Sequence, residues 1–473
     1  MNILAIDQGT TSTRALRVDA DGRNEITHAV QHRQYYPGPG RVEHDANEII
    51  ASIEACIAAS PGIDAIGIDN QGESCLAWDA KTREPLCPVI VWQDNRTQDA
   101  IDALGRDGHE ERVLELSGLP LDSYFSASKL AWILNHVDGA RDLLQQGRLR
   151  LGTTDAYFLD RLTGRFVTDI STASRTSLMN LESGQWDPEL CELFGVPVEA
   201  LPEIVPTTGE FGSIEAQGRS IPVTASVVDQ QASLYGHGCR SAGDTKITFG
   251  TGAFALMVTG NEVRRSPQQG LLPTVAWQRS TSAPVYALDG GVYCAGSAIE
   301  WARKLNLFDD YAEINAFDRP TAIERGLAFV PALSGLACPH WDRRAAGLWI
   351  GLSLETDKRD MVQALLEGIA FRAAEVVTAM SEFARVGERV SIDGGVSVNP
   401  WFCQFLADLL QRRVTVNAMA ELTALGTAAL ASDNETGIVG DDGEQTDYLP
   451  GPFDPGLRDR FSEAVSRAKG WRD

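Results

Sequence analysis

A strand–turn–strand pattern that occurs twice constrains the fold of this chain most. In the first copy the small, hydroxyl-rich stretch 8–13 (QGTTST) separates two apolar runs, and in the second copy the stretch 250–252 (GTG) does so. Short apolar runs on either side of a small-residue turn are typical of β-hairpins. We therefore expect two sheets, each beginning with a hairpin.

The length of the chain agrees with this division. A chain of 473 residues is too long for one ordinary hydrophobic core, so two domains are expected. Residues 1–240 would form the first and residues 241–473 the second, with the small polar stretch 236–243 as the crossing point. Strands alternate with helices in both halves, which predicts the α/β class for each domain.

Several helices are also predicted. Asn399 and Pro400 have the residue types of a helix N-cap and first turn. Apolar residues at helical spacing from Met361 to Met380 predict a helix that packs on a core by one face. The acidic stretch 433–447 predicts a solvated loop, and a last helix is expected to open at Asp454.

Composition and charge argue against several classes of protein. Hydrophobic residues make up 43% of the chain and charged residues 22%, which is normal for a globular enzyme and excludes wholesale disorder. No run of ~18 apolar residues occurs, so no membrane partner is expected. The first residues lack the basic start of a signal peptide. The formal net charge of −24 repels polyphosphate backbones, so no nucleic-acid partner is expected.

The eight cysteines are scattered through the chain without a CxxC pair. Scattered thiols in a long chain are typical of reduced core residues, which predicts a cytoplasmic protein. The same spacing predicts no zinc site.

Two turns and two aspartates carry the candidate chemistry. The amides and hydroxyls of the first turn suit phosphate oxygens, and the carboxylate of Asp7 just before it suits magnesium; the alternative is an ordinary polar hairpin. Together with the turn 250–252, it could hold a polyphosphate from two sides. Asp229 follows a predicted strand, where open α/β sheets place catalytic groups. Its alternative role is the N-cap of the next helix.

The chain resembles the FGGY family of carbohydrate kinases, and within it the glycerol kinases most. The stretches that carry the resemblance follow the family's order: DQGTTSTRA from Asp7, YYPGPGRVEHD from Tyr35, NQGES from Asn70, VWQDNRT from Val91, YFSASK from Tyr124, DISTASRTSLMN from Asp169, DQQASLYG from Asp229, FGTGAF from Phe249, LSGLACPHWD from Leu333, DGGVSVN from Asp393 and ELTALGTAAL from Glu421.

The resemblance implies a fold and a set of roles. The fold is α/β, with two ribonuclease-H-like domains of the actin-like ATPase type and ATP in the cleft between them. Asp7 would serve Mg²⁺, and Asp229 would be the general base that accepts the proton of the substrate hydroxyl. The phosphates and the nucleotide would be bound by Thr10, Thr11, Arg14, Thr251, Gly296, Glu300, Gly395 and Asn399. The small-molecule polyol or sugar would be bound by Gly72, Glu73, Trp92, Tyr124, Asp229, Gln230 and Phe254.

Two departures from the glycerol-kinase pattern bear on the ligands. Gly72 stands where that pattern has arginine, and Glu300 stands where it has glutamine near the purine. Losing an arginine removes up to five N–H donors and opens space. The expected reaction is ATP-dependent phosphorylation of glycerol. The alternative is a kinase for a four- or five-carbon polyol or ketose, such as erythritol or xylulose, and a more remote one is an actin-like ATPase without kinase activity. A homodimer is one assembly that the sequence allows.

Overall fold

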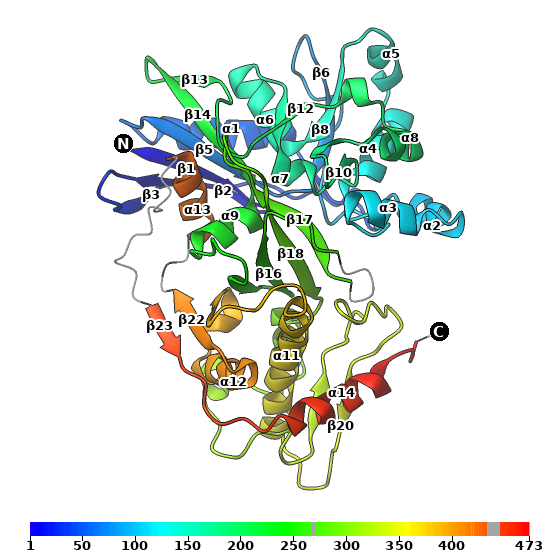
Figure 1. The fold of residues 1–473 in the computed structure, drawn as a ribbon, viewed down its shortest axis with the longest axis vertical. Helices are drawn as coiled ribbons and strands as arrows, with labels where there is room; N and C mark the ends of the chain where they lie inside the picture. Colours follow the sequence, from blue (N-terminus) through cyan, green and yellow to red (C-terminus); the bar gives the residue numbers. More distant parts are fainter. Residues whose placement is uncertain (266–269, 418, 420, 433–444, 473) are drawn as a thin grey trace.

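The computed structural model describes the whole chain except residues 266–269, 418, 420, 433–444 and 473. Two large sheets lie in two lobes of the molecule (Figure 1). The first has the strand order β13 (Ser213–Ala216), β14 (Arg219–Val228), β5 (Ala65–Asn70), β1 (Ile3–Gln8), β2 (Ser12–Val18), β3 (Asn24–Gln31). The second has the order β17 (Leu272–Trp277), β18 (Val285–Val292), β16 (Ala253–Gly260), β15 (Thr245–Phe249), β21 (Arg389–Asp393), β22 (Arg413–Asn417), β23 (Gln445–Tyr448). Both predicted hairpins are confirmed, as β1–β2 and β15–β16.

Smaller sheets and most helices surround these two. A four-stranded sheet consists of β4 (Glu43–His44), β7 (Val89–Ile90), β6 (Cys75–Asp79) and β8 (Leu149–Thr153). Three two-stranded sheets pair β9 (Val167–Asp169) with β12 (Glu203–Val205), β10 (Met179–Asn180) with β11 (Gln185–Trp186), and β19 (Ala328–Val330) with β20 (Leu348–Ile350). Helices before residue 240 are α1 (Ala46–Ala58), α2 (Gln98–Arg106), α3 (Glu110–Ser117), α4 (Ser126–His136), α5 (Ala140–Gln145), α6 (Thr154–Thr163), α7 (Ile170–Ala173), α8 (Pro188–Phe194), η1 (Val198–Ala200) and α9 (Asp229–Gly236). Those after it are α10 (Gly296–Lys304), η2 (Tyr311–Ile314), α11 (Lys358–Met380), η3 (Gly395–Val398), α12 (Pro400–Leu410), α13 (Leu422–Ala431) and α14 (Gly456–Ala468).

The predicted helix starts are present. The Asn399 side chain accepts from the backbone N–H of Phe402 and so caps α12 as expected, and Asp454 lies just before α14. Among the described residues, no helix is both long enough and apolar enough to cross a membrane.

Two local predictions were wrong in part. Helix α11 is buried around most of its circumference rather than on one face, because it lies between the second sheet and α12 and α14. Residues 433–444 of the predicted solvated loop 433–447 lie outside the described residues. Residues 445–447 belong to strand β23 and pair with β22.

Helix α13 comes from the second half of the sequence but packs on the first sheet. In Figure 1 it lies beside β1 and β2, and it contacts α9 as well. Thr427 Oγ1 donates to the Asp69 carboxylate at 2.7 Å, and the Thr224 hydroxyl donates to the carbonyl of Ala431 at 2.8 Å. A Cβ at Gly426 would lie 1.8 Å from the carbonyl oxygen of Ala232, so only glycine allows α9 and α13 to approach this closely. The division at residue 240 stays a prediction, and one helix of the later half completes the core of the earlier one.

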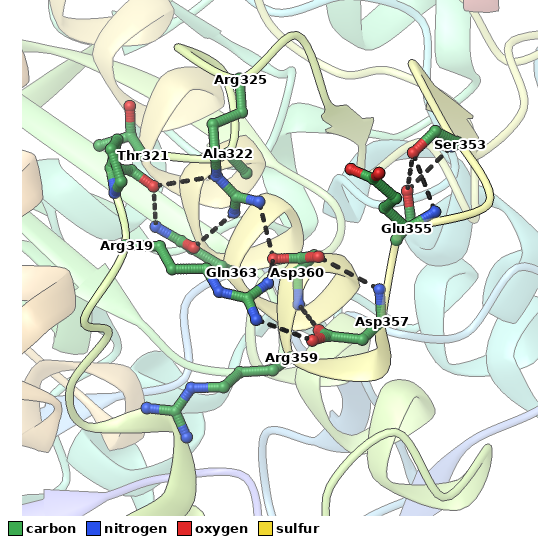
Figure 2. Close-up of polar contacts among 12 residues, drawn as sticks. Arg319, Thr321, Ala322, Arg325, Ser353, Glu355, Asp357, Arg359, Asp360 and Gln363 are labelled. Carbon is green, nitrogen blue, oxygen red and sulfur yellow. Dashed lines mark hydrogen bonds and ion pairs between the residues drawn. The ribbon is translucent and has the colours of Figure 1, made fainter.

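A buried carboxylate anchors the start of α11 (Figure 2). The side chain of Asp360 accepts from the guanidinium groups of Arg319 and Arg325 at 2.8 and 2.7 Å. It also accepts from the backbone N–H of Asp357, whose own side chain caps the helix in return. This network fixes the segment around residue 320 against the N-terminus of the long helix.

We expect Asp360→Asn to lower the free energy of unfolding at pH 7 by ~2–3 kcal/mol, because two charge-assisted contacts are lost in a buried position. Burial alone would raise the pKa of Asp360, but the Asp357 amide and the two guanidinium groups outweigh it and lower that pKa. An acid whose pKa falls on folding adds stability above its unfolded pKa of about 4, and this stability is lost as pH falls through the folded value. The difference in the free energy of unfolding between the variant and the wild type, measured by urea unfolding, should therefore become smaller below about pH 4.

The matched control is Asp318→Asn. Asp318 is exposed and lies 4.0 Å from Arg359, so its loss should change the free energy of unfolding by less than ~0.5 kcal/mol. Equal losses in both variants would show that the Asp360 network does not stabilise the fold.

Candidate active site

The carboxyl ends of β1, β5 and β14 meet at one edge of the first sheet and bring acidic side chains together. Strands β1 and β5 are parallel, and their register pairs Asp7 with Asp69. Strand β14 is parallel to β5, so Glu73 and Asp229 follow just beyond the same edge. Burial raises the pKa of Asp7, Asp69 and Asp229 above the usual range. Asp7 and Asp69 are close enough to share a proton, but among the described residues no three acidic, histidine or cysteine side chains are grouped as a metal centre, so a cation here would also need ligands from a bound phosphate.

Asp229 is the first residue of α9 rather than its N-cap. The N-cap is Val228, and the Asp229 carboxylate accepts only from the adjacent backbone N–H of Gln230, at 2.6 Å, among the described hydrogen bonds. It therefore does not make the bonds to later amides that a capping aspartate makes. Burial, followed by the negative charges of Asp7 and Glu73, raises the pKa of Asp229 to about 7. A carboxylate with this pKa is suited to accept a proton near neutral pH.

A cavity of about 800 Å³ opens between the two halves of the chain near this edge. Three of the predicted polyol residues line it: Trp92, Tyr124 and Phe254. The rings of Trp92 and Tyr124 meet edge to face at 5.5 Å, which gives the cavity a rigid apolar wall. Arg175 and Asp289, which the sequence analysis did not single out, add charged groups to the same wall.

Glu73 is joined to this wall by a buried ion pair. Arg175 Nε donates to Glu73 Oε1 at 2.7 Å, and Arg175 Nη2 lies 3.3 Å from Asp289 Oδ2. Glu73 follows β5 of the first sheet and Asp289 lies on β18 of the second, so the guanidinium connects the two halves. Gly72 lies next to Val228. The other four predicted polyol residues, Gly72, Glu73, Asp229 and Gln230, are not among the described residues that line the cavity.

The first turn connects the cavity to the predicted phosphate site. Trp92 Nε1 donates to Thr10 Oγ1 at 3.0 Å, so one turn hydroxyl contacts the cavity wall directly. The Thr11 side chain is exposed, and Arg14 Nη1 lies 3.2 Å from Glu421 Oε1 at the start of α13. Hydroxyl, amide and guanidinium groups thus gather beside Asp7, as phosphate binding requires.

The predicted nucleotide residues of the second half form one connected set. The Thr251 carbonyl accepts from the first turn of α10, and a Cβ at Gly296 would lie 2.5 Å from the carbonyl oxygen of Gly250. Glu300 of α10 accepts from the hydroxyl of Tyr311 in η2, and Asn399 Nδ2 donates to the carbonyl of Ile314 in η2 at 2.9 Å.

Gly395 begins η3, where an added Cβ would meet no atom within 4 Å. Its backbone therefore faces open space, and a ligand can approach it. Gly394 is different: its φ is +88° and an added Cβ would lie 2.3 Å from the carbonyl oxygen of Phe249, so this turn requires glycine.

Two buried lysines support the site, and no sequence pattern indicated either of them. Lys246 Nζ donates to Gln230 Oε1 at 2.7 Å and lies on β15 below the second turn; burial lowers its pKa. Lys129 Nζ donates to the carbonyl oxygens of Tyr124 and Trp92, at 2.6 and 3.4 Å. A fully buried lysine is rare unless it is paired, so burial is the signal that would indicate both residues. The sequence alone does not show that burial.

Comparisons with known proteins identify the family. Residues 2–236 match the N-terminal domain of the FGGY family of carbohydrate kinases, and residues 245–433 match its C-terminal domain. The chain belongs to this family. It is 44% identical to a glycerol kinase of Alkalilimnicola ehrlichii over 91% of this chain and 89% of that one, and 40% identical to a glycerol kinase of Haloferax volcanii over 99% and 98%. The crystal structure of Plasmodium falciparum glycerol kinase with ADP superposes with a TM-score of 0.91, at 30% identity, over 99% of this chain and 98% of that one.

Membership confirms the predicted fold class and enzyme class. The two sheets and their helices are the ribonuclease-H-like, actin-like ATPase domains of a carbohydrate kinase, and ATP is the phosphoryl donor that this class implies. The alternative of an actin-like ATPase without kinase activity is excluded by the same match. The individual roles of the site residues remain proposals.

Proposed function

We propose that this protein transfers the γ-phosphoryl group of ATP to glycerol and releases ADP and glycerol 3-phosphate. The observation that carries the proposal is the carboxylate of Asp229, whose pKa is about 7 and whose charge acts on Tyr124, a residue of the cavity wall that matches the glycerol-kinase pattern. The similarity to glycerol kinases of about 40% identity over nearly the whole chain supports the choice of glycerol.

In this mechanism Trp92, Tyr124 and Phe254 cover the carbon chain of glycerol, and Glu73 accepts from one of its hydroxyls. Asp229 accepts the proton of the attacking hydroxyl as the oxygen bonds to the γ-phosphorus. Closing the two halves around the cavity excludes water, which would otherwise be the acceptor.

On the phosphate side, Thr10 and Thr11 donate to phosphate oxygens, and Arg14 leaves Glu421 to pair with them. Asp7 suits Mg²⁺ because carboxylate oxygens are its preferred protein ligands and because burial among other acids makes an unaccompanied negative charge unfavourable there. When bound, Mg²⁺ would neutralise charge on the phosphates. Thr251, Gly296, Glu300, Gly395 and Asn399 would surround the nucleotide around η2.

A kinase for a four- or five-carbon polyol or ketose is the second candidate. Two observations favour it: Gly72 replaces the arginine of the glycerol-kinase pattern, and a cavity of about 800 Å³ exceeds what a three-carbon molecule fills. In this case the same residues act on a longer chain, and only the substrate differs.

A screen of ATP consumption with glycerol, erythritol, the pentitols and common ketoses distinguishes the two candidates. We expect glycerol to have the highest kcat/KM, because the aromatic wall and Glu73 match the glycerol-kinase motifs. A longer polyol or a ketose with a kcat/KM at least ~10-fold higher would overturn the choice of glycerol but not the kinase reaction.

We also assign the enzyme to the cytoplasm. All eight cysteines lie in the part of the chain that the structure describes, none of them forms a disulfide and seven are buried, which suits a reducing compartment.

A further inference from the structure

Arg175 is a buried cation in the cavity wall, and one of its nitrogens has no partner. The residue is only 5% exposed. Its Nε is bonded to Glu73 and its Nη2 contacts Asp289, but Nη1 is buried without a hydrogen-bond acceptor among the described residues. A guanidinium offers five N–H groups, and leaving a charged donor unsatisfied inside a protein is strongly unfavourable. Arg175 is also one of the residues that line the cavity, so a ligand bound there can supply the missing acceptor.

The guanidinium is held rigidly in this position. The guanidinium forms ion pairs with Glu73 of one half of the chain and Asp289 of the other, and the centre of the Phe125 ring lies 5.5 Å from its central carbon. These two carboxylates hold the pKa of Arg175 above its usual value although burial opposes it. A charged donor with a fixed direction discriminates between ligands more sharply than a mobile one.

The backbone conformation at position 72 explains why the guanidinium near Glu73 comes from Arg175 and not from residue 72. Gly72 has φ of +74°, in the left-handed region, and an added Cβ would touch Val228 Cγ1 at 3.4 Å. A non-glycine residue in this conformation costs about 1–2 kcal/mol. The backbone of this chain is thus unfavourable for an arginine at position 72, whereas Arg175 brings a guanidinium to Glu73 from the turn after α7.

We propose that Arg175 is a specificity-determining residue of the polyol site: Nη1 donates to a substrate hydroxyl while Nε orients Glu73 as the acceptor for another. This proposal rests on the proposed polyol kinase function and names the group that recognises the substrate. The ligand class is a small polyol with neighbouring hydroxyls, because one side of the site donates and the other accepts. An analogue that lacks the contacted hydroxyl would leave a buried charge unpaired and be rejected.

The test compares glycerol with its two monodeoxy analogues, 1,2-propanediol and 1,3-propanediol. For each enzyme the ratio of kcat/KM for glycerol over each analogue is measured, with the melting temperature. We expect Arg175→Gln to reduce at least one ratio by ~10- to 100-fold, the effect of losing a hydrogen bond to a charged donor. Arg175→Lys keeps the charge but not the two-sided geometry, so it should restore part of the ratio.

Arg96→Gln is the matched control. The Arg96 side chain is as buried as that of Arg175 and pairs with Glu43 and Asp94 at 2.6 and 2.7 Å, but Arg96 is not one of the described residues that line the cavity. We expect this variant to lose stability and to keep both substrate ratios within ~2-fold, because no hydrogen bond to substrate is lost.

Two outcomes would overturn the proposal. The first is that Arg175→Gln lowers kcat/KM for glycerol and for both analogues by the same factor, as Arg96→Gln would, since Arg175 would then only support the fold. The second, decisive even if Arg175→Gln does not fold, is that Arg175→Lys keeps both ratios of the wild type. Failure of the proposed function is a separate result: the wild type would then prefer a longer substrate, and the same ratios would be measured with that substrate and its monodeoxy analogues.

Discussion

The Asp229→Asn variant is expected to lose ~10²–10⁴-fold in kcat while its KM for glycerol changes little, because asparagine keeps the shape and a hydrogen-bonding group but cannot accept the proton. The wild-type rate should also fall at acid pH. The pKa of Asp229 is raised to about 7, so the base is protonated below that value and the rate decreases there. A cation bound beside Asp229 would shift this decrease to lower pH. The variant should not show this pH-dependent decrease. A pH profile of kcat/KM for both proteins measures these effects.

Asp187→Asn is the matched control for this experiment. Asp187 also lies where a helix begins, but it is a true N-cap, accepting from the backbone N–H of Glu189 and Leu190. Asparagine caps as well as aspartate, so this variant should retain the rate of the wild type; it should lose only ~1 kcal/mol of stability, because its amide would face the Asn180 Nδ2 donor that now bonds Asp187 Oδ2 at 2.9 Å. If Asp229→Asn behaves in the same way, Asp229 is a structural residue and the assignment as base is wrong.

The second large effect is expected for Asp7→Asn, which should lower kcat by at least ~100-fold because charge on the transferring phosphates is no longer neutralised. The stability of the fold should not decrease. Burial raises the pKa of Asp7, so its ionised form is unfavourable in the folded protein without a cation, and removing the charge should leave the melting temperature unchanged or higher.

The measurement is the melting temperature with ATP, with and without magnesium. In the wild type, ligand binding raises it by linkage, and magnesium should add to the rise. In Asp7→Asn the contribution of magnesium should disappear. A variant that keeps both turnover and the magnesium-dependent rise would contradict the assignment of Asp7 to the metal.

The sequence predicts those parts of the structure that depend on local patterns. The hairpin at Asp7, the second turn at residues 250–252 and the cap at Asn399 each follow from a few adjacent residues whose backbone preferences agree with the fold. The resemblance to the family added the residues of the cavity wall, Trp92, Tyr124 and Phe254, which the structure does bring together.

Contacts between distant segments could not be predicted in this way. Arg175 lies within one of the stretches that resemble the family, yet its importance depends on Asp289, which is on another sheet. Arg14 and Glu421 meet for the same reason, because α13 packs against β1 and β2. The spacing of apolar residues in α11 shows one buried face, but burial of the other face depends on α12 and α14, and no local period reports this.

The packing of α13 on the first sheet affects the order in which the protein can fold during synthesis. Strands β1, β5 and β14 are complete once residue 228 has been made, but the helix that covers them and bonds Asp69 ends only at Ala431. At ~5–20 residues per second, roughly 10–40 s pass before this face can be covered. Until then the apolar residues of that face are exposed on a nascent chain. The demand for chaperones should therefore be highest while residues 229–421 are being translated, and slowing translation there should increase aggregation.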